Sequence, residues 1–143
     1  MAITDRSARA TLDARSIAAL AAGDVVSFHI ITALGLLSHG ELSGLGRLFE
    51  IMQIATPFAA GWFAVASVFG AFRGDVVARP RRMLARTALS WLVALPIGLF
   101  LWSLVRQRTV QPSFALVMFF TNLVALLGWR GVFAWLAGRG RAR

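Results

Sequence analysis

The sequence contains no cysteine, no tyrosine and no lysine among its 143 residues. Without cysteine the chain has no disulfide, no thiolate nucleophile and no thiolate-bound metal or iron–sulfur cluster. Without lysine and tyrosine it also lacks a Schiff-base amine and a phenolic acid. Acidic residues are scarce as well, with six Asp and Glu against fifteen basic residues, all of them arginine. These absences confine any chemistry to a small set of residues.

Apolar residues are abundant, because they make up 58% of the chain and the mean hydropathy is +0.72. A soluble domain of this size cannot hide so much apolar surface in a core. The formal net charge of +9 would suit nucleic-acid binding, but the arginines gather in loops and at helix ends. We therefore expect a lipid bilayer around the chain and no nucleic-acid partner.

Uninterrupted apolar stretches predict four membrane spans, each close to the ~20 residues that cross a hydrocarbon core. The connections between them are short, so sequence neighbours should run antiparallel. The expected fold class is all-α: a polytopic membrane protein in which four transmembrane helices form one antiparallel up-down bundle. The expected spans cover residues 17–37, 51–72, 84–105 and 113–136.

The orientation follows from the arginines, twelve of which lie on one side of these spans and three on the other. The positive-inside rule places the larger set, and both termini, in the cytoplasm. We expect a multi-pass protein of a prokaryotic cytoplasmic (inner) membrane. Residues 1–15 suit either a short helix in the headgroup layer or a disordered tail. The first span is too long for a signal peptide and contains Asp24.

Two ionisable residues of opposite charge lie at membrane depth, where each costs at least ~2.5 kcal/mol unless it finds a partner or a cavity. Asp24 lies ~12 Å and Arg130 ~9 Å inside the cytoplasmic end of their spans. We expect an intramembrane ion pair between them. In the alternatives, Arg130 snorkels to the cytoplasmic headgroups, or Asp24 carries protons or takes part in catalysis.

A second match of depth joins His29 and Asn122 near the membrane midplane. Pro96 in the third span frees the carbonyl of Leu92 to accept a hydrogen bond, so a midplane polar cluster of these groups is expected. Alternatively, His29 is the single axial ligand of a tetrapyrrole pigment such as a chlorin. A haem held by two histidines is not supported, because the other histidine, His39, lies at the outer interface.

The remaining candidates are loop and aromatic residues. His39 and Glu41 in the outer loop are two ligand types without a third, so no metal site is expected. Trp62 and the pair Phe119 and Phe120 suit packing against lipid or against a flat apolar ligand, such as a carotenoid, a quinone or a chlorin.

Several separated motifs together resemble a family of small membrane proteins known as domain of unknown function family 3054. The resemblance extends from the first span to the fourth, and it implies a four-helix membrane fold without implying a reaction. It directs attention to Asp24, His39, Pro57, Trp62 and Arg130. The motifs are Gly23-Asp24, Gly35 with Ser38-His39-Gly40, Thr56-Pro57-Phe58 with Gly61-Trp62, Ser113-Phe114 and Gly128-Trp129-Arg130.

Taken together, these features favour a non-catalytic accessory or structural subunit of a larger membrane complex, which packs against other membrane proteins and holds a lipid, quinone, carotenoid or chlorin-type pigment. No catalytic residue is expected, because the spans carry no second carboxylate and no nucleophile beside a base. The alternative is a small transporter or proton-coupled carrier that uses Asp24 and His29.

Overall fold

A computed structural model describes residues 14–39 and 44–140 of the chain. This part of the chain is almost entirely helical, in agreement with the expected all-α class. Its helices are α1 (Ala14–His39), α2 (Leu45–Val68), α3 (Gly74–Val77), α4 (Pro80–Arg106) and α5 (Pro112–Gly140).

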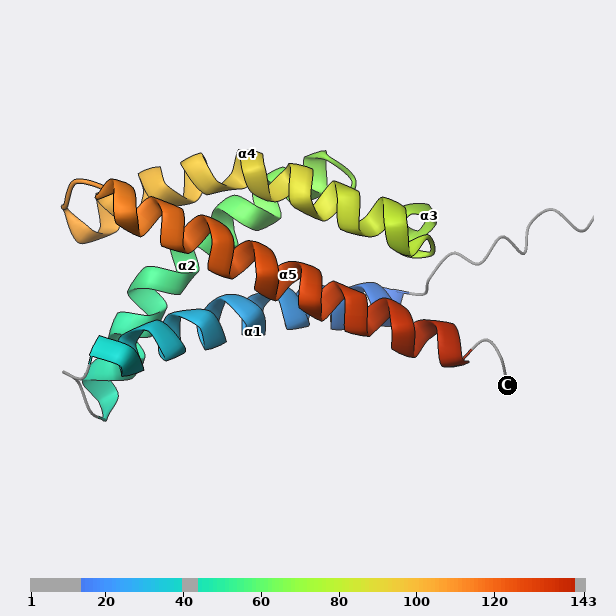
Figure 1. Ribbon diagram of the computed structural model, residues 1–143, viewed down its shortest axis with the longest axis horizontal. Coiled ribbons are helices and arrows are strands. Elements are labelled where there is room, and N and C mark those ends of the chain that lie inside the picture. Colours follow the sequence, from blue (N-terminus) through green and yellow to red (C-terminus); the bar gives the residue numbers. More distant parts are fainter. Residues whose placement is uncertain (1–13, 40–43, 141–143) are drawn as a thin grey trace, which may run out of the picture.

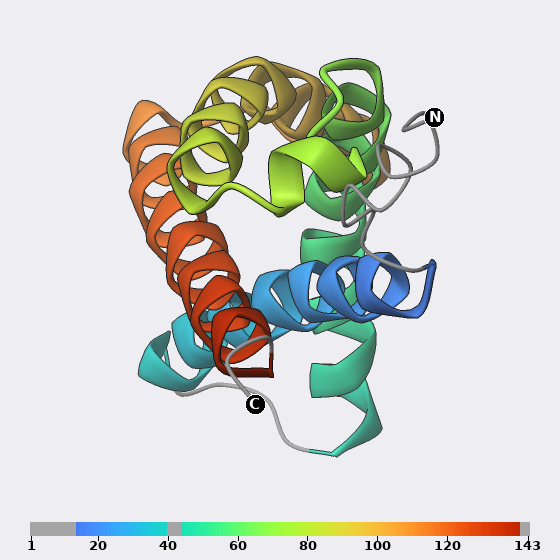
Figure 2. The same cartoon turned by 90° about the vertical axis from the view of Figure 1, so that its right-hand side faces the viewer.

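The four long helices form an antiparallel bundle (Figure 1). Helices α1 and α4 run in one direction along the long axis, and α2 and α5 run in the other. Seen along that axis they form a ring in which α1 neighbours α2 and α5, while α4 neighbours the same two helices (Figure 2). The start of α1, the short helix α3 and the end of α5 all lie at the same end of the bundle.

All four long helices are long and apolar enough to cross a membrane. Their outward sides carry large apolar groups, and Leu34, Phe100 and Leu116 are each more than half exposed. Such a surface is stable in hydrocarbon, where the helices satisfy their own backbone hydrogen bonds. The candidate membrane spans are Ala14–Ser38, Leu45–Val68, Pro80–Arg106 and Pro112–Arg139.

Helix α2 differs most from its expected span over residues 51–72. It begins earlier, at Leu45, because two charged residues interrupt the apolar run without interrupting the helix. It ends at Val68, and Gly70 then adopts a left-handed φ of 69°, which lets the chain turn. Because the helix starts earlier, Pro57 lies well inside it. The short helix α3, in the connection that follows, was not expected.

Helices α2 and α4 pack closely against each other at two glycines. A Cβ atom on Gly61 would lie 3.0 Å from the backbone nitrogen of Gly98, and one on Gly98 would lie 2.7 Å from a ring carbon of Phe58. The missing side chains let the two backbones pack closely, as is common between membrane helices. Next to this crossing, the ring of Trp91 packs against Phe28 and Phe58, with centroid distances of 5.5 and 6.4 Å.

Candidate functional site

An ion pair between Asp24 of α1 and Arg130 of α5 lies inside the bundle. Arg130 donates from Nε to Oδ1 of Asp24 at 3.1 Å and from Nη2 to Oδ2 at 2.6 Å. Neither side chain is exposed. The two parallel, charge-assisted hydrogen bonds give the planar geometry that an arginine and a carboxylate prefer. Arg130 therefore points into the protein and does not snorkel to the surface.

The second terminal nitrogen of Arg130 binds groups from other parts of the bundle. Its Nη1 donates to the carbonyl oxygen of Ala71 at 3.1 Å and to Oγ1 of Thr87 at 3.3 Å. The guanidinium carbon also lies 5.0 Å from the ring centroid of Trp62 and 4.7 Å from that of Phe72. These are cation–π distances, so the rings attract the positive charge. Arg130 is thus held from α2, from the turn after α2 and from α4.

Trp62 contacts both partners of the ion pair. Its Nε1 donates to Oδ2 of Asp24 at 3.1 Å, and its side chain is fully buried. The expectation that Trp62 packs against lipid or a flat ligand is therefore wrong. The indole faces the interior because its N–H, which needs an acceptor in an apolar surrounding, finds one in the carboxylate.

Gly23 and Trp129, the neighbours of the charged residues, fasten α1 to α5. The indole of Trp129 lies directly on Gly23, where an added Cβ would be only 1.9 Å from a ring carbon. Its Nε1 donates to the carbonyl oxygen of Leu20 at 3.1 Å. Glycine is needed here because any side chain would occupy the space of the ring. The absence of a side chain beside Asp24 thus brings α5 close enough for Arg130 to reach it.

Several groups of this site were not identified from the sequence. Thr87 is fully buried, and its hydroxyl donates to the carbonyl oxygen of Met83 at 2.8 Å, which leaves its oxygen free to accept from Arg130. A threonine hydroxyl in an apolar span needs a hydrogen-bond partner, so Thr87 could have been identified as a candidate from the sequence. Ala71 contributes only a backbone carbonyl, and Phe72 only its ring, so neither carries a signal in the sequence.

His29 and Asn122 do not meet, and the midplane cluster expected around them is absent from the described part of the chain. His29 Nδ1 lies 2.8 Å from the carbonyl oxygen of Val25 in its own helix, on the exposed side of α1. Asn122 donates from Nδ2 to the carbonyl oxygen of Met118 at 3.0 Å, and its Oδ1 is buried without a partner in the structure. Five residues separate His29 from Asp24, which rotates it by ~140° away from the interior.

Pro96 and Leu92 do not contribute to a midplane polar cluster either. Both side chains lie on the exposed side of α4. The carbonyl freed by the proline is therefore on the opposite side of α4 from the face that packs against the other helices.

The two candidate phenylalanines have different surroundings. Phe119 is partly buried against the apolar core, and its carbonyl oxygen accepts a hydrogen bond from Nε1 of Trp91 at 3.0 Å. Phe120 is 59% exposed and meets the ring of Phe119 edge to face at 5.0 Å. Of this pair, Phe120 is the residue placed to touch lipid or a bound molecule.

The outer-loop candidates cannot be placed, because Glu41 and the side chain of His39 lie outside the described residues. Within the described residues, no three histidine or acidic side chains are grouped as they would be around a metal ion. At this end of the bundle, Arg106 instead donates to Gln53 Oε1 at 2.7 Å and to Glu50 Oε1 at 3.2 Å, which joins α4 to α2.

Comparison with known proteins gives a family and no characterised relative. No match was found among curated proteins or among solved structures. A family model described as "Protein of unknown function (DUF3054)" matches residues 21–133. This range contains Gly23, Asp24, Trp62, Trp129 and Arg130, the family-motif residues that meet at the ion pair, and it confirms the resemblance seen in the sequence. The chain belongs to this family of proteins of unknown function.

Proposed function

We propose that the chain is a non-catalytic integral membrane protein that serves as an accessory or structural subunit of a larger membrane complex. In this proposal it resides in a prokaryotic cytoplasmic membrane with both termini on the cytoplasmic side, as the positions of its arginines favour. The observation that carries the proposal is the saturation of the buried ion pair. Asp24 and Arg130 bind each other and groups from the surrounding helices, and neither is exposed.

A buried group that acts on a substrate needs free hydrogen-bonding capacity and a path to the substrate. Both oxygens of Asp24 already accept hydrogen bonds from Arg130, and one accepts a third from Trp62. Arg130 donates four hydrogen bonds, which use four of the five N–H groups of its guanidinium. The pair is therefore arranged to hold the helices together, and recognition is left to the outer surface.

That surface offers a groove for an apolar molecule between α2 and α4. Its volume is about 400 Å³, and it is open along one side. Such a groove suits an acyl or isoprenoid chain, as in a lipid, a quinone or a carotenoid. The groove is lined by Met52, Gln53, Thr56, Pro57 and Ala60 of α2 and by Leu101 and Val105 of α4.

His29 gives a specific reason to include chlorin-type pigments among the bound molecules. When its Nδ1 donates to the carbonyl oxygen of Val25, its Nε2 is the unprotonated nitrogen, and the ring lies on the exposed side of α1. A histidine that ligates a metal commonly has its other nitrogen held by a backbone carbonyl in this way. Purified wild-type protein should then carry a pigment absorbance that His29→Leu removes. Thr121→Leu is the control, because it also replaces an exposed side chain that hydrogen-bonds within its own helix, and it should keep the absorbance.

The subunit role is tested by photocrosslinking in native membranes. A photoreactive residue replaces Val124, which is 69% exposed on α5, or Leu126, which is fully buried two positions along the same helix. We expect one reproducible crosslinked partner of fixed mass from position 124 and none from position 126. The proposal fails if position 124 yields only lipid adducts and the chain elutes from mild detergent as a ligand-free monomer.

The geometry gives less support to the alternative of a proton-coupled carrier. A relay needs neighbouring groups that exchange protons, but His29 points away from Asp24, which is enclosed by Arg130 and Trp62. Flux into proteoliposomes that disappears in a folded Asp24→Asn variant would favour the carrier over the subunit.

A further inference from the structure

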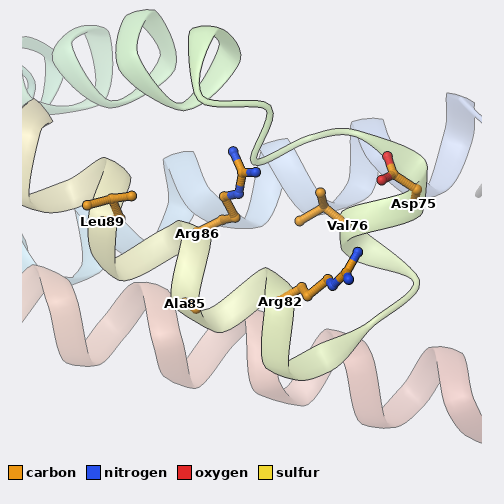
Figure 3. Close-up of a pocket in the computed structure, with 6 residues that line it drawn as sticks. All are labelled: Asp75, Val76, Arg82, Ala85, Arg86 and Leu89. Atoms are coloured by element: carbon orange, nitrogen blue, oxygen red, sulfur yellow. The ribbon is translucent and has the colours of Figure 1, made fainter.

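A pocket with two arginines lies between α3 and the first turns of α4 (Figure 3). It has a volume of about 280 Å³ and is open on one side. Val76, which is only 5% exposed, forms part of its wall. The other lining residues are Asp75, Arg82, Ala85, Arg86 and Leu89.

The two arginines of the pocket are differently held. Arg86 donates from Nη1 to the carbonyl oxygen of Phe69 at 2.6 Å, which fixes its side chain near the end of α2. Arg82 has no hydrogen bond or ion pair with the residues that the structure describes. Both project from the same side of α4 toward the segment that contains α3 (Figure 3). Several N–H groups of the two guanidiniums therefore remain available to an anion.

The local charge is strongly positive. Residues 73–86 contain five arginines and one acidic residue. That acid, Asp75, is offset by Arg73, whose Nε lies 3.5 Å from its carboxylate. The first turn of α4 also contains no acidic residue and no side-chain cap, so the positive end of its helix dipole is not neutralised. The pocket thus presents an unbalanced positive charge.

The apolar residues of the pocket distinguish a lipid from a soluble anion. Ala85 and Leu89 continue the side of α4 that carries the arginines, and Leu89 is 49% exposed. Leu89 follows Arg82 by seven positions, which places it ~10 Å farther along the helix toward the membrane interior. A phosphate bound by the arginines would therefore leave its glycerol and acyl chains beside Ala85 and Leu89.

We infer that this pocket binds the phosphodiester of an anionic phospholipid, with Arg82 and Arg86 on the phosphate and with an acyl chain along Ala85 and Leu89. Arginine suits this contact because its planar N–H groups pair with phosphate oxygens. The inference requires only that the chain lies in a membrane, and it is independent of the subunit role.

The test is native mass spectrometry of the full-length protein in detergent, titrated with phosphatidylglycerol or with phosphatidylcholine of the same acyl chains. Wild-type protein should bind phosphatidylglycerol several-fold more tightly. Arg82→Gln should weaken that binding about fivefold, and Arg82→Gln with Arg86→Gln should weaken it further, since each arginine near an anionic headgroup contributes a roughly constant increment. Arg81→Gln is the matched control, because it removes the same charge one position away and outside the pocket.

Ala85→Trp fills the pocket without changing the charge, and it too should reduce phosphatidylglycerol binding. Equal losses in Arg81→Gln and Arg82→Gln would show that general surface charge binds the lipid, and this would overturn the inference. So would equal binding of the two lipids. If millimolar inorganic phosphate displaces phosphatidylglycerol and Ala85→Trp has no effect, the pocket recognises a soluble anion and the lipid assignment is wrong.

Discussion

The Nη2 atom of Arg130 lies 2.6 Å from Oδ2 of Asp24, although 106 residues separate them in the sequence. This contact joins α1 and α5, the first and the last long helix. Among the four long helices, these are the neighbours in the ring that do not follow each other along the chain. Because Trp62 and Thr87 bind the same pair, one polar cluster fastens all four long helices.

Asp24→Asn should strongly destabilise the protein. The amide keeps the shape of the carboxylate but leaves the guanidinium of Arg130 buried without a counter-charge, and breaking a buried pair in this way costs about 3–5 kcal/mol. The loss should be visible as a lower unfolding temperature in detergent and as lower abundance in membranes.

Asp75→Asn is the control for this change, because Asp75 belongs to an ion pair with Arg73 whose side chains are both more than half exposed. Such a pair contributes little to stability. If Asp24→Asn is as stable and abundant as Asp75→Asn, the buried pair does not hold the bundle together.

Trp62→Phe should destabilise the protein by about 1.5–3 kcal/mol, which is the range for a hydrogen bond to a charged group. The substitution keeps an aromatic ring near Arg130 but removes the N–H that donates to Asp24. Thermal unfolding in detergent measures the effect. Trp135→Phe, at a position that is 55% exposed, should change the midpoint far less. Equal midpoints for the two variants would rule out a contribution from the indole N–H.

Gly23→Ala should separate α1 from α5, because the new methyl group would lie 1.9 Å from the ring of Trp129. Overpacking of this kind costs roughly 1–3 kcal/mol. Gly128→Ala is the matched control, since no atom lies within 4 Å of its added Cβ. The thermal unfolding midpoint in detergent should fall in Gly23→Ala and stay near the wild-type value in Gly128→Ala. Equal midpoints for the two variants would contradict the packing described.

The absence of cysteine makes the orientation directly testable with single-cysteine variants. Arg81→Cys lies at the end of the bundle that holds the start of α1, and Gln107→Cys lies at the other end, after α4. In intact cells a membrane-impermeant thiol reagent should label position 107 and reach position 81 only after permeabilisation. Labelling of position 81 alone in intact cells would invert the proposed topology.

Hydropathy predicted the existence and order of the four long helices because each apolar run is long enough to span hydrocarbon. It placed their ends less well. The start of α2 contains charged residues that lower the hydropathy without disfavouring the helix, and its end depends on the left-handed conformation of Gly70. Helix ends depend on single residues, and the mean hydropathy of a long apolar stretch does not reveal them.

To predict which side chains meet in the site, both their depth in the membrane and their direction around the helix are needed, and only the depth could be inferred from the sequence. Equal depth suggested a contact between Asp24 and Arg130, and the structure brings these two together. The same reasoning for His29 and Asn122 was wrong, because depth does not say which way a side chain points around its helix. Trp62 was expected to pack against lipid or a flat apolar ligand for a related reason, since the sequence does not show that α2 turns this residue toward Asp24.

A double-mutant cycle on Asp24→Leu and Arg130→Met tests the central claim most directly, since it measures how strongly the two side chains stabilise each other. Hydrogen bonds between membrane helices typically give coupling energies of about 0.6 kcal/mol. For a buried pair that fastens the bundle, we predict a coupling free energy above about 2 kcal/mol in denaturant unfolding, with the double variant more stable than the sum of the single losses implies. A coupling at or below the ordinary value would show that the pair does not hold the four helices together.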